Sequence, residues 1–206
     1  MDKYYVAIAG NIGVGKSTLT HLLSQELGWE AFYEAVDDNP YLSDFYRDMR
    51  TWSFHSQVYF LSRRLRHHRD LARRPNSVIQ DRTVYEDAEV FARNLYRQGL
   101  MSERDYTSYR ELYEIMRDVL PPPSLLVYLR ASAETLHQRI ALRGREYERE
   151  ITPGYLEQLN VLYEEWVGHF DLCPVLILPA DTLDYAHNQA QVRCIAEKIV
   201  EKLAMK

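Results

Sequence analysis

Residues 10–17 read Gly-Asn-Ile-Gly-Val-Gly-Lys-Ser. An apolar segment at 4–9 precedes it, and an amphipathic segment at 16–27 follows. The pattern G-x-x-x-x-G-K-S is typical of a strand, a phosphate-binding loop and a helix in that order, because its glycines let backbone N–H groups close around phosphates. The helix then directs the positive end of its dipole at the bound anion.

The loop predicts a site for ATP and Mg²⁺. Lys16 supplies a cation for the β- and γ-phosphates, and Ser17 supplies a hydroxyl for the metal ion. The loop residues expected to hold the nucleotide are Gly10, Asn11, Gly13, Val14, Gly15, Lys16, Ser17 and Thr18. GTPase switches, ATPases and small-molecule kinases share this motif. The chain contains neither N-K-x-D nor D-x-x-G, which argues against a GTPase switch.

The composition narrows the class of protein further. A chain of 206 residues with 46% hydrophobic residues predicts one domain with a core of its own. The net charge of −5 argues against a nucleic-acid partner. The two cysteines, Cys173 and Cys194, form no metal or disulfide pattern. No apolar run is long enough to span a membrane, and no signal peptide precedes the first strand, so we expect a cytoplasmic protein.

Short apolar runs alternate with amphipathic ones along the rest of the chain. Further strands are predicted at 29–33, 77–81, 125–129 and 175–178. Further helices are predicted at 40–50, 53–74, 83–98, 102–119, 132–143, 153–170 and 185–204. This alternation predicts an α/β fold with about five parallel strands and helices on both faces of the sheet. Ligands then bind at the carboxyl ends of the strands.

Two predicted strands end in an acidic residue. Asp81 ends the strand at 77–81 and suits a role beside Mg²⁺, and Arg82, which follows it, can reach the transferring phosphoryl group. Glu34 follows the strand at 29–33 and can accept the proton of a hydroxyl nucleophile. We also expect Glu34 on the metal side, together with Ser17 and Asp81. The alternatives are that Asp81 or Thr83 only caps the next helix and that Glu34 is a surface residue.

Several motifs together resemble the deoxyribonucleoside kinase family over nearly the whole chain. Besides residues 10–17, they are Glu-Ala-Val at 34–36, Trp-Ser-Phe-His-Ser-Gln at 52–57, Asp-Arg-Thr-Val-Tyr-Glu-Asp at 81–87, and Arg-Gly-Arg-Glu-Tyr-Glu at 143–148 with Arg139 before it. The form Asp-Arg-Thr is similar to bacterial members of the purine type. The resemblance implies transfer of the γ-phosphoryl group of a nucleoside triphosphate to the 5′-hydroxyl of a deoxynucleoside, with Glu34 as general base and Arg82 near the 5′-oxygen.

The resemblance also implies which residues select the base. Gln57 and Arg64 share one helix face, and the Gln57 amide resembles the family's base-reading glutamine. Phe91 resembles the aromatic residue that stacks on the base. Asp87 pairs with Arg64 and favours amino-bearing bases, because family members that prefer thymidine tend to have a small apolar residue there. We therefore expect deoxyadenosine first, then deoxyguanosine or deoxycytidine.

The sugar and the phosphates receive their own expected contacts. Tyr46 and Glu148 match the pair that binds the sugar 3′-hydroxyl in the family. Arg139, Arg143 and Arg145 resemble the family's lid, which we place at about 139–150, and guanidinium groups match phosphate oxygens. An ordinary packed tyrosine, a surface glutamate and solvated arginines are the alternatives for these residues.

The expected partners are a deoxynucleoside, a nucleoside triphosphate and, from the resemblance alone, a second copy of the chain. A nucleoside monophosphate kinase is an alternative enzyme, and it would need further arginines for the acceptor phosphate. A non-catalytic nucleotide-binding switch is the second alternative. It differs from a kinase in that it does not require Glu34 beside Arg82.

Overall fold

The computed structural model describes residues 3–33 and 39–205. Its centre is one sheet of five parallel strands in the order β2-β3-β1-β4-β5. The strands are β1 (Tyr5–Gly10), β2 (Glu30–Phe32), β3 (Val78–Asp81), β4 (Leu125–Arg130) and β5 (Val175–Pro179). Ile8 of β1 lies opposite Asp81 of β3, which brings the end of β3 beside the phosphate-binding loop.

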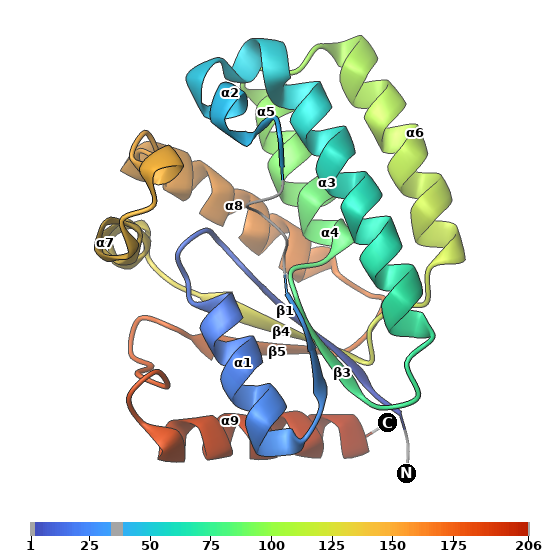
Figure 1. The fold of residues 1–206 in the computed structure, drawn as a ribbon, viewed down its shortest axis with the longest axis vertical. Helices are drawn as coiled ribbons and strands as arrows, with labels where there is room; N and C mark the ends of the chain where they lie inside the picture. The colour runs from blue at the N-terminus through green and yellow to red at the C-terminus, as the bar shows by residue number, and fades with distance from the viewer. Residues whose placement is uncertain (1–2, 34–38, 206) are drawn as a thin grey trace.

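Helices cover both faces of this sheet (Figure 1). They are α1 (Lys16–Leu27), α2 (Leu42–Arg47), α3 (Met49–Ala72), α4 (Val84–Glu86), the π-helical segment η1 (Asp87–Ala92), α5 (Arg93–Arg97), α6 (Glu103–Val119), α7 (Ala133–Arg143), the 3₁₀ turn η2 (Glu146–Glu148), α8 (Pro153–His169) and α9 (Gln189–Ala204). Helices α1 and α9 lie on one face, while α3, α4 and α8 lie on the other (Figure 1).

Two hydrophobic cores follow from the alternation of side chains along the strands. In β1, Val6 and Ile8 pack with α1 and α9, whereas Ala7 and Ala9 pack with the helices of the opposite face. All six residues of β1 are buried. A central parallel strand that is covered on both faces has this composition, and it holds the phosphate-binding loop at a fixed place.

The predicted α/β fold with five parallel strands is confirmed, and the main differences lie at helix ends. The predicted helix at 40–50 ends at Arg47, and α3 begins at Met49 instead of 53. Asp48 explains this break, because its carboxylate accepts hydrogen bonds from Thr51 N at 3.2 Å and Thr51 Oγ1 at 2.6 Å and so caps α3. Helix α9 begins at Gln189 instead of 185, where Asn188 caps it.

The predicted helix at 83–98 forms as three consecutive parts, α4, η1 and α5. The π-helical part contains Asp87 and Phe91, two residues expected in the site. Single π-helical turns inside helices are frequent at functional sites. Within the described residues, no helix has the length and apolar character needed to cross a bilayer.

Candidate active site

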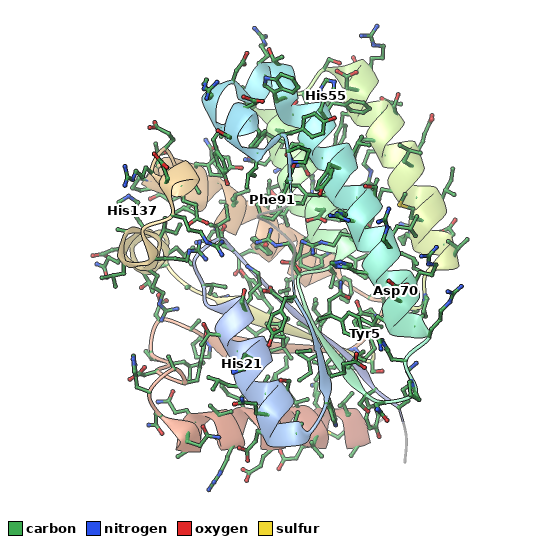
Figure 2. All side chains as sticks on the ribbon, viewed as in Figure 1. Tyr5, His21, His55, Asp70, Phe91 and His137 are labelled. Carbon is green, nitrogen blue, oxygen red and sulfur yellow. The ribbon has the colours of Figure 1, made fainter. Side chains whose placement is uncertain are left out.

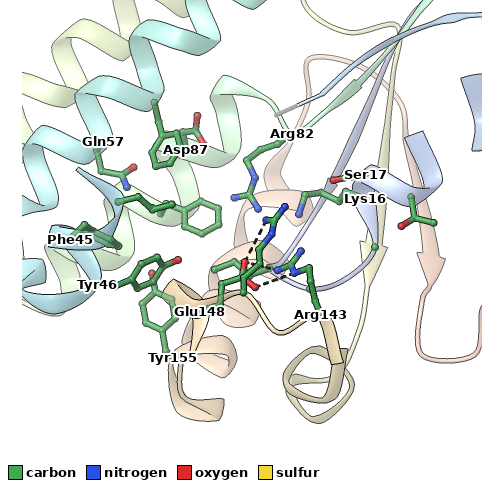
Figure 3. Close-up of a pocket in the computed structure, with 18 residues that line it drawn as sticks. Lys16, Ser17, Phe45, Tyr46, Gln57, Arg82, Asp87, Arg143, Glu148 and Tyr155 are labelled. Atoms are coloured by element: carbon green, nitrogen blue, oxygen red, sulfur yellow. Dashed lines mark hydrogen bonds and ion pairs between the residues drawn. The ribbon is translucent and has the colours of Figure 1, made fainter. Parts of the chain in front are cut away.

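A cavity of about 260 Å³ opens between the phosphate-binding loop and the helices above the sheet. Figure 3 shows Gln57 and Asp87 on one side, Lys16 and Ser17 on the other, and Arg82 between them. The lining residues are Ile12, Gly13, Gly15, Lys16, Ser17, Thr18, Leu42, Phe45, Tyr46, Gln57, Phe60, Arg82, Asp87, Phe91, Arg143, Arg145, Glu148 and Tyr155. Residues far apart in the sequence therefore meet at the carboxyl end of the sheet, where the parallel topology predicts a site.

The phosphate-binding loop has the backbone that its sequence predicts. Gly13 and Gly15 have φ values of 81° and 101°, in the left-handed region that favours glycine. A Cβ atom at Gly13 would lie 2.7 Å from Ile140 Cγ1, and one at Gly15 would collide with the Tyr185 hydroxyl. Lys16 Nζ donates to Gly10 O at 2.8 Å and to Asn11 O at 3.0 Å, which places the ammonium group across the loop.

Ser17 and Asp81 form the expected metal side of the cavity. Ser17 Oγ donates to Asp81 Oδ2 at 2.5 Å. Asp81 Oδ1 is buried and has no hydrogen-bond partner among the described residues. The described residues contain no cluster of three or more His, Cys, Asp or Glu side chains fit to hold a metal ion by themselves. Two oxygen donors of this kind fit Mg²⁺ that is shared with phosphate oxygens, since Mg²⁺ is usually bound by one or two protein oxygens and its substrate.

Arg82 occupies an unusual backbone conformation between the two sides. Its φ of 64° is the only positive value at a non-glycine residue in the described part of the chain. The guanidinium carbon lies 4.3 Å from the centre of the Phe91 ring, which is within the range of a cation–π contact. Backbone strain of this kind costs about 1–3 kcal/mol and persists only where surrounding contacts hold it.

Glu86 is one of those contacts, and we did not predict it from the sequence. Its side chain is fully buried. Oε1 accepts from Gly10 N at 3.1 Å and from Tyr163 Oη at 2.9 Å, and Oε2 accepts from Thr83 N at 3.0 Å. Burial raises the pKa of Glu86, and the charges of Arg82 and Lys16 oppose that shift. The Thr-x-x-Glu spacing at 83–86 is the capping-box pattern, which was the available sequence signal.

The residues expected to read the base lie close together. Arg64 Nε and Asp87 Oδ2 form a buried ion pair at 2.9 Å. Gln57 lies on the same face of α3 and lines the cavity. Its Oε1 is buried without a hydrogen-bond partner among the described residues. A buried amide oxygen of this kind fits a ligand that carries an N–H donor, such as the amino group of a base.

Two of the arginines expected in a lid pair with the carboxylate expected at the sugar. Arg143 holds Glu148 in a fork, with Nε 3.0 Å from Oε2 and Nη2 2.6 Å from Oε1. Arg145 Nη1 lies 3.7 Å from Glu148 Oε1. Tyr46 lines the same cavity from α2, and Figure 3 shows it near Tyr155 and Glu148. Burial raises the pKa of the Tyr155 hydroxyl to about 12.

Arg139 stands behind the loop and lines a second cavity, which it shares with Arg143 and Tyr185. Its Nη1 donates to Val14 O at 2.9 Å and its Nη2 donates to Ala180 O at 2.9 Å. Tyr185 Oη also donates to Val14 O, at 3.1 Å. These bonds fasten the loop to α7 and to the segment after β5.

The remaining predicted residues divide into structural and undescribed ones. The Asn11 side chain donates to Leu156 O and Asn160 Oδ1, and therefore joins the loop to α8. Val14 is fully buried and takes part through its carbonyl. Glu34 lies outside the described residues. The apolar lining by Leu42, Phe45, Phe60 and Tyr155 was not predicted, because single apolar residues on amphipathic helices carry no signal of their own.

The comparisons with known proteins decide the family. A family model described as deoxynucleoside kinase matches residues 6–204. This chain belongs to the deoxynucleoside kinase family. The resemblance drawn from the motifs is thereby confirmed, and the enzyme is a phosphotransferase, not a switch.

Similar sequences include kinases with different named substrates. The deoxyadenosine/deoxycytidine kinase of Bacillus subtilis (strain 168) is 39% identical over 94% of this chain and 90% of its own length. The deoxyguanosine kinase of Lactobacillus acidophilus is 36% identical over 96% of this chain and 90% of its own length. Because these names differ in the base, the comparisons establish a deoxynucleoside kinase and leave its preferred base to direct measurement.

Similar solved structures include the deoxyadenosine kinase of M. mycoides. Its structure with the products dCMP and a flexible dCDP has a TM-score of 0.85, with 33% sequence identity over 96% of this chain and 99% of that one. Its structure with bound dATP has a TM-score of 0.83, with 33% identity over 95% and 98% of the two chains. This chain therefore has the same fold as the M. mycoides kinase over nearly its whole length.

Proposed function

We propose that this deoxynucleoside kinase transfers the γ-phosphoryl group of Mg-ATP to the 5′-hydroxyl of deoxyadenosine, with deoxyguanosine and deoxycytidine as poorer acceptors, in cytoplasmic deoxynucleoside salvage. The observation that carries the proposal is that the phosphate-binding loop and the Gln57 amide line the same cavity. The unpartnered Gln57 Oε1 favours a base with an exocyclic amino group, and the opposite amide nitrogen can donate to a ring nitrogen.

Each residue has a part in the proposed reaction. Lys16 and Arg82 neutralise the phosphate oxygens, and Arg139, Arg143 and Arg145 add charge from a lid at about 139–150. Ser17 and Asp81 hold Mg²⁺, which supplies charge neutralisation between the phosphates when bound. Glu34 accepts the proton of the 5′-hydroxyl, and closure of the lid excludes water. Tyr46 and Glu148 bind the 3′-hydroxyl, and Phe91 stacks on the base.

The test is release of ADP from Mg-ATP with deoxyadenosine, deoxyguanosine, deoxycytidine and thymidine in turn. We expect the highest kcat/KM with deoxyadenosine, and a fall on the order of 10² to 10⁴-fold in Glu34→Gln, which keeps the size of the side chain and removes the base. A higher kcat/KM with thymidine would overturn the base assignment and leave the kinase activity standing. Phosphorylation of dAMP in preference to deoxyadenosine would favour the monophosphate kinase alternative.

Asp87 gives a second, independent test of base selection. The Arg64–Asp87 pair lies at the base side of the cavity, and its charge favours amino-bearing bases. In a double variant with both charges removed, Arg64→Met with Asp87→Ala, we expect the ratio of kcat/KM for thymidine over deoxyadenosine to rise at least tenfold. An unchanged ratio would show that this pair does not set the preference.

A homodimer built on α6 completes the proposal. Leu112, Ile115 and Val119 form an exposed apolar stripe along one face of α6, and the side chains of Ile115 and Val119 are 66% and 71% exposed. Helix α6 forms the outer layer of the molecule beside α3 (Figure 1). A two-fold axis beside α6 would bury this stripe against the same stripe of a second copy.

Light scattering tests the dimer with a matched pair of variants. Ile115→Glu places a charge in the stripe, and we expect it to give a monomer. Val200→Glu on α9 is the control, because Val200 is also exposed, at 47%, and lies on the opposite side of the sheet. A monomeric wild-type protein, or a dimer that survives Ile115→Glu, would contradict the proposed interface.

A further inference from the structure

We propose that Glu86 is a positioning residue for phosphoryl transfer, which fixes the phosphate-binding loop and the Arg82–Thr83 turn relative to each other. The inference rests on the proposed roles of Lys16 and Arg82 at the phosphates. It assigns a function to a residue that touches neither substrate in that proposal. Glu86 does not line either of the two cavities described above.

The carboxylate joins three parts of the chain that are distant in the sequence. Gly10 N is the first amide of the phosphate-binding loop, Thr83 N follows Arg82 directly, and Tyr163 comes from α8. Tyr163 Oη also lies 2.8 Å from Gly10 O, so its single hydrogen is shared between this carbonyl and Glu86 Oε1. A shift of Glu86 therefore moves the loop that carries Lys16 and the turn that carries Arg82.

Only a carboxylate satisfies these neighbours. Each of its two oxygens accepts a hydrogen bond from a backbone N–H group, Oε1 from Gly10 and Oε2 from Thr83. A glutamine has one acceptor oxygen and one NH₂ group, so either orientation sets an NH₂ group against one of these backbone N–H groups. Because the site is fully buried, no water replaces the lost acceptor. The replacement of Glu86 by an isosteric glutamine therefore displaces the loop or the turn.

The same contacts explain how Arg82 keeps its backbone conformation. Thr83 N donates to Glu86 Oε2, and Arg82 N donates to Ile8 O at 3.0 Å, so the amides on both sides of the Arg82 Cα atom are fixed. The Tyr163 ring meets Phe91 edge to face at 6.3 Å, and Phe91 lies under the Arg82 guanidinium. The Glu86 contacts therefore act on Arg82 in two ways. They fix its backbone through Thr83, and they reach its guanidinium through Tyr163 and the Phe91 ring.

The variants Glu86→Gln and Tyr163→Phe test the inference against a control, Tyr5→Phe. Tyr163 and Tyr5 are both buried tyrosines, and each donates its hydroxyl to a buried side-chain oxygen; Tyr5 Oη donates to Gln80 Oε1 at 2.6 Å. Tyr5 lies near the opposite end of the sheet from Phe91 (Figure 2). Loss of either hydroxyl removes one buried hydrogen bond, so both tyrosine variants should lose similar stability.

The kinetic split separates positioning from general destabilisation. With the deoxynucleoside that the wild type prefers, we expect kcat per folded enzyme to fall on the order of 10- to 100-fold in Glu86→Gln, because a misplacement of about 1 Å can cost that much. We expect a fall of about fivefold in Tyr163→Phe and none in Tyr5→Phe, with KM for the deoxynucleoside within about twofold of wild type in all three. Equal kcat losses in Tyr163→Phe and Tyr5→Phe, or an unchanged kcat in Glu86→Gln, would overturn the inference.

A second readout keeps the inference testable if Glu86→Gln fails to fold or if the proposed substrate is wrong. Affinity for Mg-ADP, measured by titration calorimetry without a nucleoside, should weaken at least threefold in Tyr163→Phe and stay unchanged in Tyr5→Phe. A wild type that phosphorylates no deoxynucleoside would contradict the proposed function alone. Equal affinities for Mg-ADP in the two tyrosine variants would contradict the positioning role of the Glu86 contacts.

Discussion

The phosphate side of the cavity, around residues 10–17, and the side proposed as a lid, around Arg143, Arg145 and Glu148, are held in different ways. On the phosphate side, Lys16 bonds to loop carbonyls, and Gly10 bonds to a fully buried carboxylate, so the positions are set by backbone and buried contacts. On the lid side, Glu148 is held by Arg143 and Arg145; the Glu148 side chain is 5% exposed, whereas both arginine side chains are 37% exposed. Partly exposed ion pairs are weak and exchangeable, whereas buried backbone contacts are not. The difference indicates that the loop at 10–17 is held by the fold and that Arg143 and Arg145 can exchange partners.

Loss of the Lys16 ammonium group should have the largest effect. In Lys16→Met we expect kcat to fall on the order of 10³-fold, because a preorganised cation at the transferring group is removed. Lys16 is buried and donates to two loop carbonyls, so the free energy of unfolding should also fall, by about 1–3 kcal/mol. Steady-state ADP release and urea unfolding measure the two quantities.

The matched control lies at the other end of the cavity, where the deoxynucleoside is proposed to bind, and we call this end the nucleoside side. The control is Gln57→Leu, which keeps the size of the side chain. We expect it to raise KM for the deoxynucleoside and to leave kcat within a few-fold of wild type. If Gln57→Leu lowered kcat as much as Lys16→Met, the two sides would not differ in the way proposed.

The Arg64–Asp87 pair sharpens the comparison, because it shows that the nucleoside side has a rigid part too. The two side chains are 3% and 5% exposed. In Asp87→Asn, the Arg64 guanidinium loses its charged partner in a buried place, and we expect the free energy of unfolding to fall by about 3 kcal/mol. Urea unfolding at pH 7.5 measures this loss.

A double variant supplies the control for that loss. Arg64→Met with Asp87→Leu removes both charges and fills the space with apolar atoms, so it should recover most of the lost stability. A loss in the double variant as large as that in Asp87→Asn would show that packing, not the unpaired charge, is the cause. The rigid part of the site would then extend beyond the ion pair.

Glu148 tests the exchangeable side directly. In Glu148→Gln we expect KM for the deoxynucleoside to rise about tenfold, since a charge-assisted hydrogen bond to the 3′-hydroxyl is weakened. The free energy of unfolding should change by less than about 1 kcal/mol, because the arginine partners are partly exposed. A large loss of stability with an unchanged KM would make the Arg143–Glu148 pair a structural contact and remove the contrast between the two sides.

The fold was predictable because its signals are local. The loop at 10–17 carries its glycines, its lysine and its hydroxyl in one stretch, and the strand before it and the helix after it follow as expected. The break at Asp48 was missed because an N-cap can stop one helix and start the next without a glycine or a proline. The helix pattern at 83–98 did not reveal η1, because a pattern of apolar residues does not distinguish a short π-helical turn from the α-helical turns beside it.

The candidate site was predictable for residues that stand within recognisable sequence motifs and contribute their side chains to the cavity. Gln57, Asp87 and Arg82 come together as the motifs imply. Glu86 was missed because its importance lies in long-range contacts to Gly10 and Tyr163, and no local pattern encodes a contact across 77 residues. The pairing of Arg143 with Glu148 was also missed, since both were assigned to substrates and the sequence does not say which of them meet each other.

The smallest predicted effect lies away from both sides and concerns pH. His68 on α3 is buried, and its Nε2 lies 2.8 Å from Pro121 O. Burial lowers the pKa of His68, and the hydrogen bond with Pro121 opposes that shift. The folded protein therefore binds a proton less readily than the unfolded chain, whose histidines titrate near pH 6.5. The stability from neutral His68 is present above about pH 6.5 and is lost as the pH falls from there toward the lowered value.

The variant His68→Gln cannot take up that proton, and its amide can still donate to the Pro121 carbonyl. We expect the difference in unfolding free energy between pH 7.5 and pH 5.5 to shrink by about 1 kcal/mol in His68→Gln, as measured by urea unfolding at both values. His67, whose pKa is also lowered by burial, makes a matched neighbour, and His67→Gln should have a smaller effect because this residue is only half-buried. If the loss of stability at pH 5.5 persisted unchanged in His68→Gln, the proton would be taken up by other groups, and the role given to His68 would be wrong.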